Sequence, residues 1–167
     1  MDRLLFIYTL LFLNFSSFAQ NNDIWTSFPN KDTTLIGFKN KNGVVKIEPK
    51  FSGFTTARKF ENIIAVTEEK NGKWESYYLT KAGKIVGRDS LFVFDNSPDC
   101  ENEGFIRFTD RKTDKMGIFN AEGKIAIPAE YSNLTKVKNG IFIGLKDAKK
   151  NNGWRTFFLE RRKRILN

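Results

Sequence analysis

A glycine recurs in this chain at an interval of 40 residues, as Gly43, Gly83 and Gly123. Each of the three stands between a short apolar run and a second, alternating apolar run. A period of this length is typical of proteins that stack one small supersecondary unit on the next. Two apolar runs around a glycine-containing turn predict a β-hairpin, because glycine supplies the positive φ that such turns need. The period therefore predicts a tandem array of hairpins.

Longer segments of the chain align at twice this interval. Residues 36–51 align with residues 116–131, so that Gly37 stands opposite Gly117. Both glycines lie inside an apolar run and not at a turn. We interpret them as structural positions of the repeat.

The other two copies align with each other in the same way. Residues 74–86 align with residues 154–166, so that Trp74 stands opposite Trp154. Lys163 takes the place of the turn glycine in the last copy. Both tryptophans are interpreted as structural positions, like the glycines.

A third apolar run closes each unit, at residues 63–66, 105–108 and 141–145. Three short strands per copy predict an all-β fold of tandem repeats of ~40 residues. The strands would be antiparallel, and the array would be a hairpin meander or an open, solenoid-like stack. Aromatic side chains at alternating strand positions are expected to fill the core.

Several segments of the chain share a further pattern, in which a small motif precedes an aromatic or apolar strand. These segments are Asn71-Gly72-Lys73-Trp74, Gly153-Trp154, Lys115-Met116-Gly117 and Ile36-Gly37. The stretch GKIAIPAEY at 123–131 matches the second strand of the unit and its proline. Over residues 35–166 the chain in this respect resembles the bacterial WG repeat. The resemblance implies a β-rich repeat protein that serves as a binding or scaffolding module, and it carries over no catalytic residue.

The amino-terminal residues read as a secretory signal peptide. Arg3 is followed by an apolar run from Leu4 to Leu13 and then by Ser17-Phe18-Ala19, which predicts cleavage before Gln20. The apolar run is too short to span a bilayer comfortably. We expect an exported protein that is periplasmic, cell-surface or secreted, with no transmembrane segment in the mature chain.

These patterns divide the chain as follows. We expect a signal peptide at 1–19, a lead-in at 20–34 and a WG-like repeat domain at 35–167, with copies at about 35–73, 74–114 and 115–153 and a partial copy at 154–167.

The positive charge of the chain gathers at its carboxyl end. Residues 20–131 hold 17 Lys and Arg against 16 Asp and Glu, whereas residues 132–167 hold 10 against 2. A basic terminal copy is expected to attract a protein or an anionic envelope polymer, or to discourage edge-to-edge pairing of strands. Interleaved basic and aromatic residues also fit nucleic acid, but export argues against that partner. The expected anionic-partner face consists of Lys149, Lys150, Arg155, Arg161, Arg162, Lys163 and Arg164.

The residue types argue against most catalytic chemistry. The chain has no histidine, which excludes Ser-His and Cys-His nucleophiles and histidine-ligated metals. Its one cysteine, Cys100, cannot form an intramolecular disulfide; we expect an unpaired loop thiol, with an intermolecular bridge as the alternative. It lies in an acidic insert, residues 95–104, which we interpret as a solvated loop and not as a cation site. We expect no catalytic residue, cofactor or metal.

These observations together predict a secreted, non-enzymatic β-repeat module. It would bind another macromolecule at the cell envelope or outside the cell through its basic carboxyl-terminal face. The alternative is a small carboxylate-based hydrolase acting on envelope glycans, for which Glu48 and Glu130 are the recurring acids.

Overall fold

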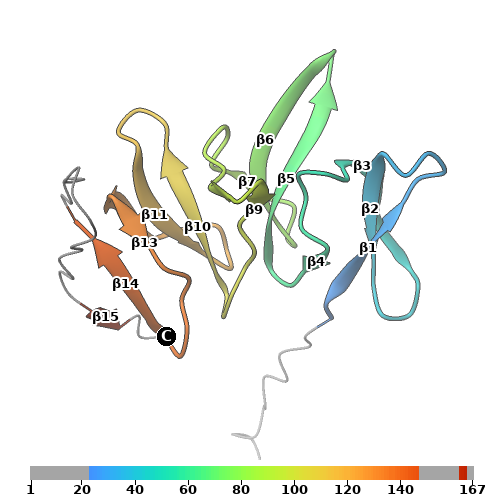
Figure 1. Ribbon diagram of the computed structural model, residues 1–167. Helices are drawn as coiled ribbons and strands as arrows, with labels where there is room; N and C mark the ends of the chain where they lie inside the picture. The colour runs from blue at the N-terminus through green and yellow to red at the C-terminus, as the bar shows by residue number, and fades with distance from the viewer. Residues whose placement is uncertain (1–22, 147–161, 165–167) are drawn as a thin grey trace, which may run out of the picture.

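The computed structural model describes residues 23–146 and 162–164 of the chain (Figure 1). All the elements in these ranges are β-strands, and every strand pair is antiparallel, so the predicted all-β class is confirmed. The described part of the chain contains no apolar helix of membrane-spanning length. The strands are β1 (Trp25–Pro29), β2 (Leu35–Lys39), β3 (Val45–Ser52), β4 (Lys59–Phe60), β5 (Ile63–Lys70), β6 (Lys73–Thr80), β7 (Ile85–Val86), β8 (Val93–Phe94), β9 (Ser97–Pro98), β10 (Phe105–Asp110), β11 (Lys115–Asn120), β12 (Ile125–Tyr131), β13 (Asn133–Leu134), β14 (Ile141–Leu145) and β15 (Arg162–Arg164).

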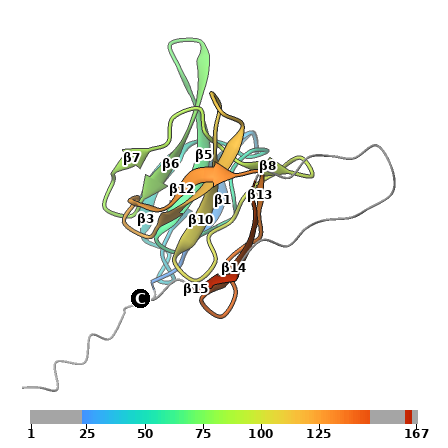
Figure 2. The ribbon, with the colours of Figure 1, turned by 90° about the vertical axis from the view of Figure 1, so that its left-hand side faces the viewer.

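The strands form four sheets along the molecule. The largest has seven strands in the order β4-β1-β2-β3-β5-β6-β7, and Figure 2 shows that it curls. Two three-stranded sheets, β10-β11-β12 and β13-β14-β15, and the short pair β8-β9 complete the described fold. The strand pairs follow one another across Figure 1 from β1–β2 to β14–β15, and the β5–β6 hairpin projects beyond its neighbours in both views.

The three recurring glycines occupy equivalent turns. Gly43, Gly83 and Gly123 have φ values of 79°, 80° and 67°. Each donates its N–H to the carbonyl three residues earlier, at 3.0, 2.9 and 2.9 Å. Only glycine adopts this backbone conformation at little cost, which explains why the same residue recurs at the turns.

The residue that begins each turn also has the same role in all three. The side-chain oxygens of Asn40, Thr80 and Asn120 accept the backbone N–H four residues later, at 2.9, 3.1 and 2.8 Å. These bonds satisfy a backbone donor that would otherwise lack a partner at the turn.

The strands beside the first and third of these turns pair in corresponding registers. Ile36 lies opposite Phe51 and Phe38 opposite Ile47 in one sheet. The residues 80 positions later, Met116 with Tyr131 and Ile118 with Ile127, pair in the same way. Between these pairs lie Gly37 and Gly117, where both registers shift.

Two long hairpins are buried on both faces. In β5–β6, Ile64 and Tyr77 pack into one apolar cluster, whereas Ile63 and Tyr78 pack into the next. In β10–β11, Phe108 belongs to that second cluster, and Ile118 belongs to a third. Because side chains alternate along a strand, each of these hairpins separates two adjacent cores.

The hairpins cross the copy boundaries expected from the sequence. β5 ends before the expected boundary at 73/74 and β6, which begins at Lys73, runs across it, whereas β10 and β11 lie on either side of residue 114. β5 and β6 are joined by an Asn71-Gly72 turn, in which both residues have positive φ. β1 falls in the expected lead-in, yet it pairs with β2 and β4 and belongs to the seven-stranded sheet.

In the expected partial copy at 154–167, the residue aligned with the turn glycine lies in a strand. Lys163, at the place of the turn glycine, lies in β15 and pairs with Phe142. A lysine lacks the freedom of glycine at positive φ, so nothing at this position favours a turn.

Candidate functional site

Most of the expected basic face lies outside the described residues. This holds for Lys149, Lys150, Arg155 and Arg161, and also for Trp154 and the expected signal peptide. Arg162–Arg164 form β15, which pairs with β14 at the end of the sheet β13-β14-β15. The basic face therefore stays a prediction.

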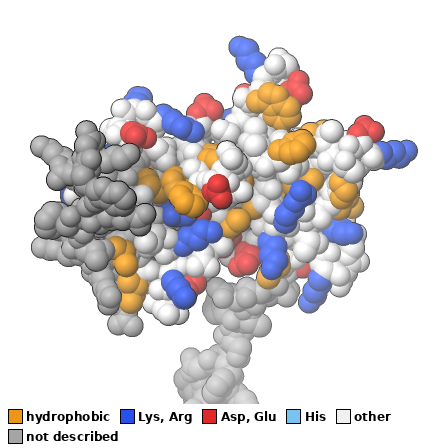
Figure 3. Space-filling model, in the orientation of Figure 1, with side chains coloured by type: hydrophobic (Ala, Val, Ile, Leu, Met, Phe, Trp, Pro, Cys, Tyr) orange, Lys and Arg blue, Asp and Glu red, His pale blue; other side chains and the backbone are white. Residues whose placement is uncertain are grey.

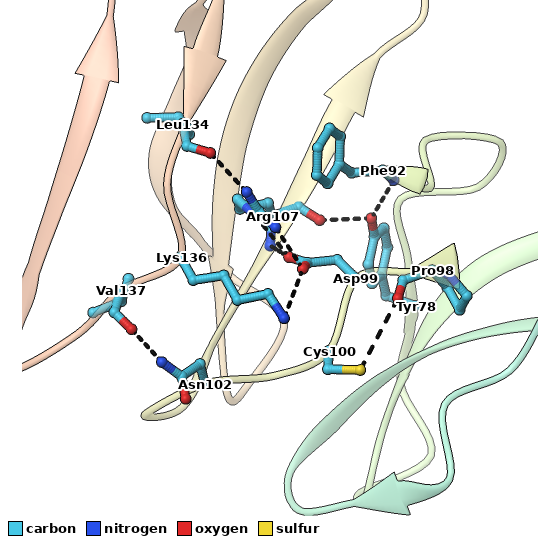
Figure 4. Close-up of polar contacts among 10 residues, drawn as sticks. All are labelled: Tyr78, Phe92, Pro98, Asp99, Cys100, Asn102, Arg107, Leu134, Lys136 and Val137. Atoms are coloured by element: carbon cyan, nitrogen blue, oxygen red, sulfur yellow. Dashed lines mark hydrogen bonds and ion pairs between the residues drawn. The ribbon is translucent and has the colours of Figure 1, made fainter. Parts of the chain in front are cut away.

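The acidic insert is not simply a solvated loop, because Asp99 is only 4% exposed. Its carboxylate accepts two hydrogen bonds from the Arg107 guanidinium, at 2.7 Å from Nη2 and 2.9 Å from Nε (Figure 4). The Lys136 ammonium lies 3.5 Å from the same carboxylate. The interpretation of the whole insert as solvent-exposed is therefore wrong for Asp99, which is buried because two cations compensate its charge.

Arg107 extends this ion pair into the neighbouring strands. Its Nη1 donates to the Leu134 carbonyl at 2.7 Å, and its guanidinium lies 4.5 Å from the centre of the Phe92 ring. Its own carbonyl accepts the Tyr78 hydroxyl at 2.7 Å (Figure 4). The cluster thus connects β6, β10 and β13, which belong to three different sheets.

Two further acids of the insert bind backbone amides of distant turns. The Glu101 carboxylate accepts the N–H groups of Asn62 and Ile63, at 2.7 and 2.8 Å. The Glu103 carboxylate accepts those of Asn139 and Gly140, at 2.7 and 2.9 Å. The backbone bonds lower the pKa of Glu103. The insert therefore connects the turn at residues 62–63 with the turn at residues 139–140. The carboxylates of Glu101 and Glu103 thus bind backbone groups of the protein.

Cys100 is exposed and free, as expected for an unpaired loop thiol. Its sulfur lies 4.0 Å from the Pro98 carbonyl oxygen, which is a weak contact (Figure 4). Within the described residues, no group of three or more cysteine and acidic side chains could hold a metal ion.

A second buried carboxylate, that of Glu68, belongs to β5 in the β5–β6 hairpin. Glu68 accepts the Tyr77 hydroxyl at 2.6 Å and pairs with Lys70 at 2.6 Å and Lys50 at 3.1 Å. Burial raises the pKa of Glu68, but the hydrogen bonds from Lys70, Tyr77 and Lys50 outweigh it and lower this pKa to about 2. Burial and the neighbouring Glu68 raise the pKa of Tyr77. Glu68 is therefore a stable anion that holds the lysines in place.

An open cleft of about 370 Å³ lies beside this cluster. Arg88 is fixed there by Glu75, 2.8 Å from its Nη1, and by the Tyr77 ring, whose centre lies 5.5 Å from the guanidinium. The backbone N–H of Asp89 donates to the Ser76 carbonyl at 2.8 Å. The cleft is lined by Lys70, Glu75, Ser76, Arg88 and Asp89.

Apolar side chains at a recurring position are exposed. Val45, Ile85 and Ile125 begin the strand after each glycine turn and are 43%, 38% and 61% exposed. Trp74, interpreted from the sequence as a structural position, is 57% exposed near the end of the projecting hairpin. Apolar side chains form separate patches among charged ones on the face drawn in Figure 3. These large apolar side chains therefore lie outside the core.

No protein-family model, curated protein or solved structure matches the chain significantly. The resemblance to WG repeats stays a prediction that rests on the residues and their spacing.

The two acids expected in a hydrolase lie on different sheets. Glu48 is exposed on β3, and Glu130 on β12 pairs with Lys146 at 2.9 Å. Sequence reasoning did not find the cleft, because its residues have no shared motif. The only sequence signal for the cleft was the cluster of charged residues on either side of β6.

Proposed function

We propose that this chain is an exported, non-enzymatic module of tandem WG-like β-repeats. It binds another macromolecule at the cell envelope or outside the cell, and its basic carboxyl-terminal copy contributes the main electrostatic attraction. The sequence supports export and the charge asymmetry, and the structure of residues 23–146 supports the repeat organisation through its equivalent turns and strand registers.

One observation favours binding over a purely structural role. Val45, Ile85 and Ile125 follow the repeat period, yet each is exposed at the first residue of its strand. A single exposed apolar side chain is ordinary, but three at the same strand position support contacts that successive copies make with one partner. Repeat arrays commonly bind partners over such surfaces, which span several units.

Charge reversal tests the contribution of the basic copy. Changing Arg161, Arg162, Lys163 and Arg164 to glutamate should weaken capture of partners from an envelope extract by about tenfold or more. The chain from residue 20 onward would serve as bait, and mass spectrometry would identify what high salt elutes.

A matched control changes the same number of charges elsewhere. Its four substitutions replace the exposed residues Lys31, Lys41, Lys46 and Lys112 by glutamate. Equal loss of partners in both variants would show that net charge alone attracts them, and retention in the carboxyl-terminal variant at high salt would refute the basic-face proposal.

A further inference from the structure

We propose that the cleft beside the β5–β6 hairpin binds a neutral sugar unit of a glycan. Its lining contains both hydrogen-bond donors and hydrogen-bond acceptors and no apolar side chain. The proposal concerns a different surface from the basic carboxyl-terminal copy and does not depend on it.

The donors of the cleft already contact partners within the protein before any ligand binds. Arg88 uses Nη1 on Glu75 and rests on the Tyr77 ring, which leaves the other N–H groups of its guanidinium for a ligand. Lys70 is held by Glu68 at 2.6 Å and still has further N–H donors. Such pre-organisation reduces the entropy lost on binding.

The acceptors come from the two acidic residues of the lining. The backbone of Asp89 is fixed, since its carbonyl accepts the Arg111 Nε at 2.8 Å and its N–H donates to Ser76. Among the described residues, no side chain pairs with the Asp89 carboxylate. The Asp89 carboxylate is exposed, so a ligand that donates several hydrogen bonds can replace the water around it and can also reach the Glu75 oxygen that Arg88 leaves unused.

The charges of the lining select the class of ligand. Two cations, Lys70 and Arg88, face two carboxylates, Glu75 and Asp89, so the net charge of the lining is zero. An anion would gain little over a neutral molecule and would be repelled by the Asp89 carboxylate. A peptide normally anchors through apolar or aromatic side chains, and no apolar side chain lines this cleft. A polyhydroxylated ring matches, because each hydroxyl both donates and accepts.

The test uses chemical shifts of the isotope-labelled chain from residue 20 onward. The probes are neutral trisaccharides of glucose, galactose, mannose and N-acetylglucosamine. We expect at least one of them to shift the amide signals of residues 70, 75, 76, 88 and 89, and expect salt at about 0.5 M to leave its affinity unchanged. That salt independence separates this site from the basic face, whose binding salt would weaken.

Two substitutions and a matched control decide the assignment. Asp89→Asn and Arg88→Gln should each weaken binding by about tenfold. Asp89 has a φ of 54°, which asparagine tolerates, so the fold should persist. Asp95→Asn makes the same change at an exposed residue with a φ of 51° in the β8–β9 turn and should bind like the parent chain.

Three results would overturn the proposal. They are that no trisaccharide shifts these amides, that Asp89→Asn binds as well as Asp95→Asn, and that salt at about 0.5 M abolishes the binding. The variant with four reversed charges at residues 161–164 should bind the trisaccharide normally, so that failure of this site and failure of the basic face are told apart.

Discussion

Replacing Asp99 by alanine is expected to lower the free energy of unfolding by about 3–5 kcal/mol. The substitution leaves the Arg107 guanidinium, which is 13% exposed, without the carboxylate that binds two of its nitrogens. An uncompensated buried charge costs more than the hydrogen bonds that are lost. The loss is also expected to loosen the contacts that Arg107 makes with Leu134 and Phe92.

Urea unfolding followed by circular dichroism measures this effect. Asp32→Ala, at an exposed aspartate, is the control and should change stability by less than about 0.5 kcal/mol. Combining Asp99→Ala with Arg107→Met should cost less than the sum of the single changes, because the stranded charge is then absent. A cost below about 1 kcal/mol for Asp99→Ala would contradict the role given to this pair.

The second large effect is expected from Gly117→Ala, at about 2–3 kcal/mol. A Cβ atom there would lie 2.6 Å from the Ile127 carbonyl oxygen and 2.5 Å from the Phe108 ring. Backbone must move to relieve the first of these overlaps. The equivalent Gly37 meets the Ile47 carbonyl at 2.3 Å, so Gly37→Ala should cost a similar amount.

A turn glycine provides the comparison for this prediction. Gly83 has a φ of 80°, and a Cβ atom added there would meet no other atom within 4 Å. Gly83→Ala should therefore cost only the backbone strain, about 1–2 kcal/mol. Thermal and urea unfolding of the three variants would rank them. If Gly83→Ala were as damaging as Gly117→Ala, close packing would not be the reason for the in-strand glycines.

The sequence predicted the features that depend on local conformation. A turn that needs positive φ favours glycine strongly, so Gly43, Gly83 and Gly123 could be recognised without any tertiary contact. The runs at 63–66, 105–108 and 141–145 fall within β5, β10 and β14, because alternating apolar residues specify a strand wherever it packs.

Features that depend on distant partners could not be predicted in this way. The burial of Asp99 requires Arg107 and Lys136 to lie around it, and neither is marked as its partner by spacing or motif. The acceptor roles of Glu101 and Glu103 were not predicted, because they need turns that are far away in the sequence. The β5–β6 and β10–β11 hairpins were also not predicted, because the sequence does not show which neighbouring strands pair with each other.

The exposure of Trp74 shows a limit of the aromatic pattern. Alternation predicts core packing for it, yet β6 extends beyond the neighbouring strands and places it on the projecting end of the hairpin. Phe54 and Phe94 are exposed as well, at 84% and 72%. For Trp74, the length of the strand relative to its neighbours decides burial, and the sequence does not encode that length locally.

The claim on which the account depends is that the sequence period is also the structural period. Cross-strand nuclear Overhauser effects in the labelled chain test it most directly. The account predicts backbone contacts between Ile36 and Phe51 and between Phe38 and Ile47, and the same contacts 80 residues later, between Met116 and Tyr131 and between Ile118 and Ile127. Helical contact patterns, or a different register in the two sheets, would contradict it.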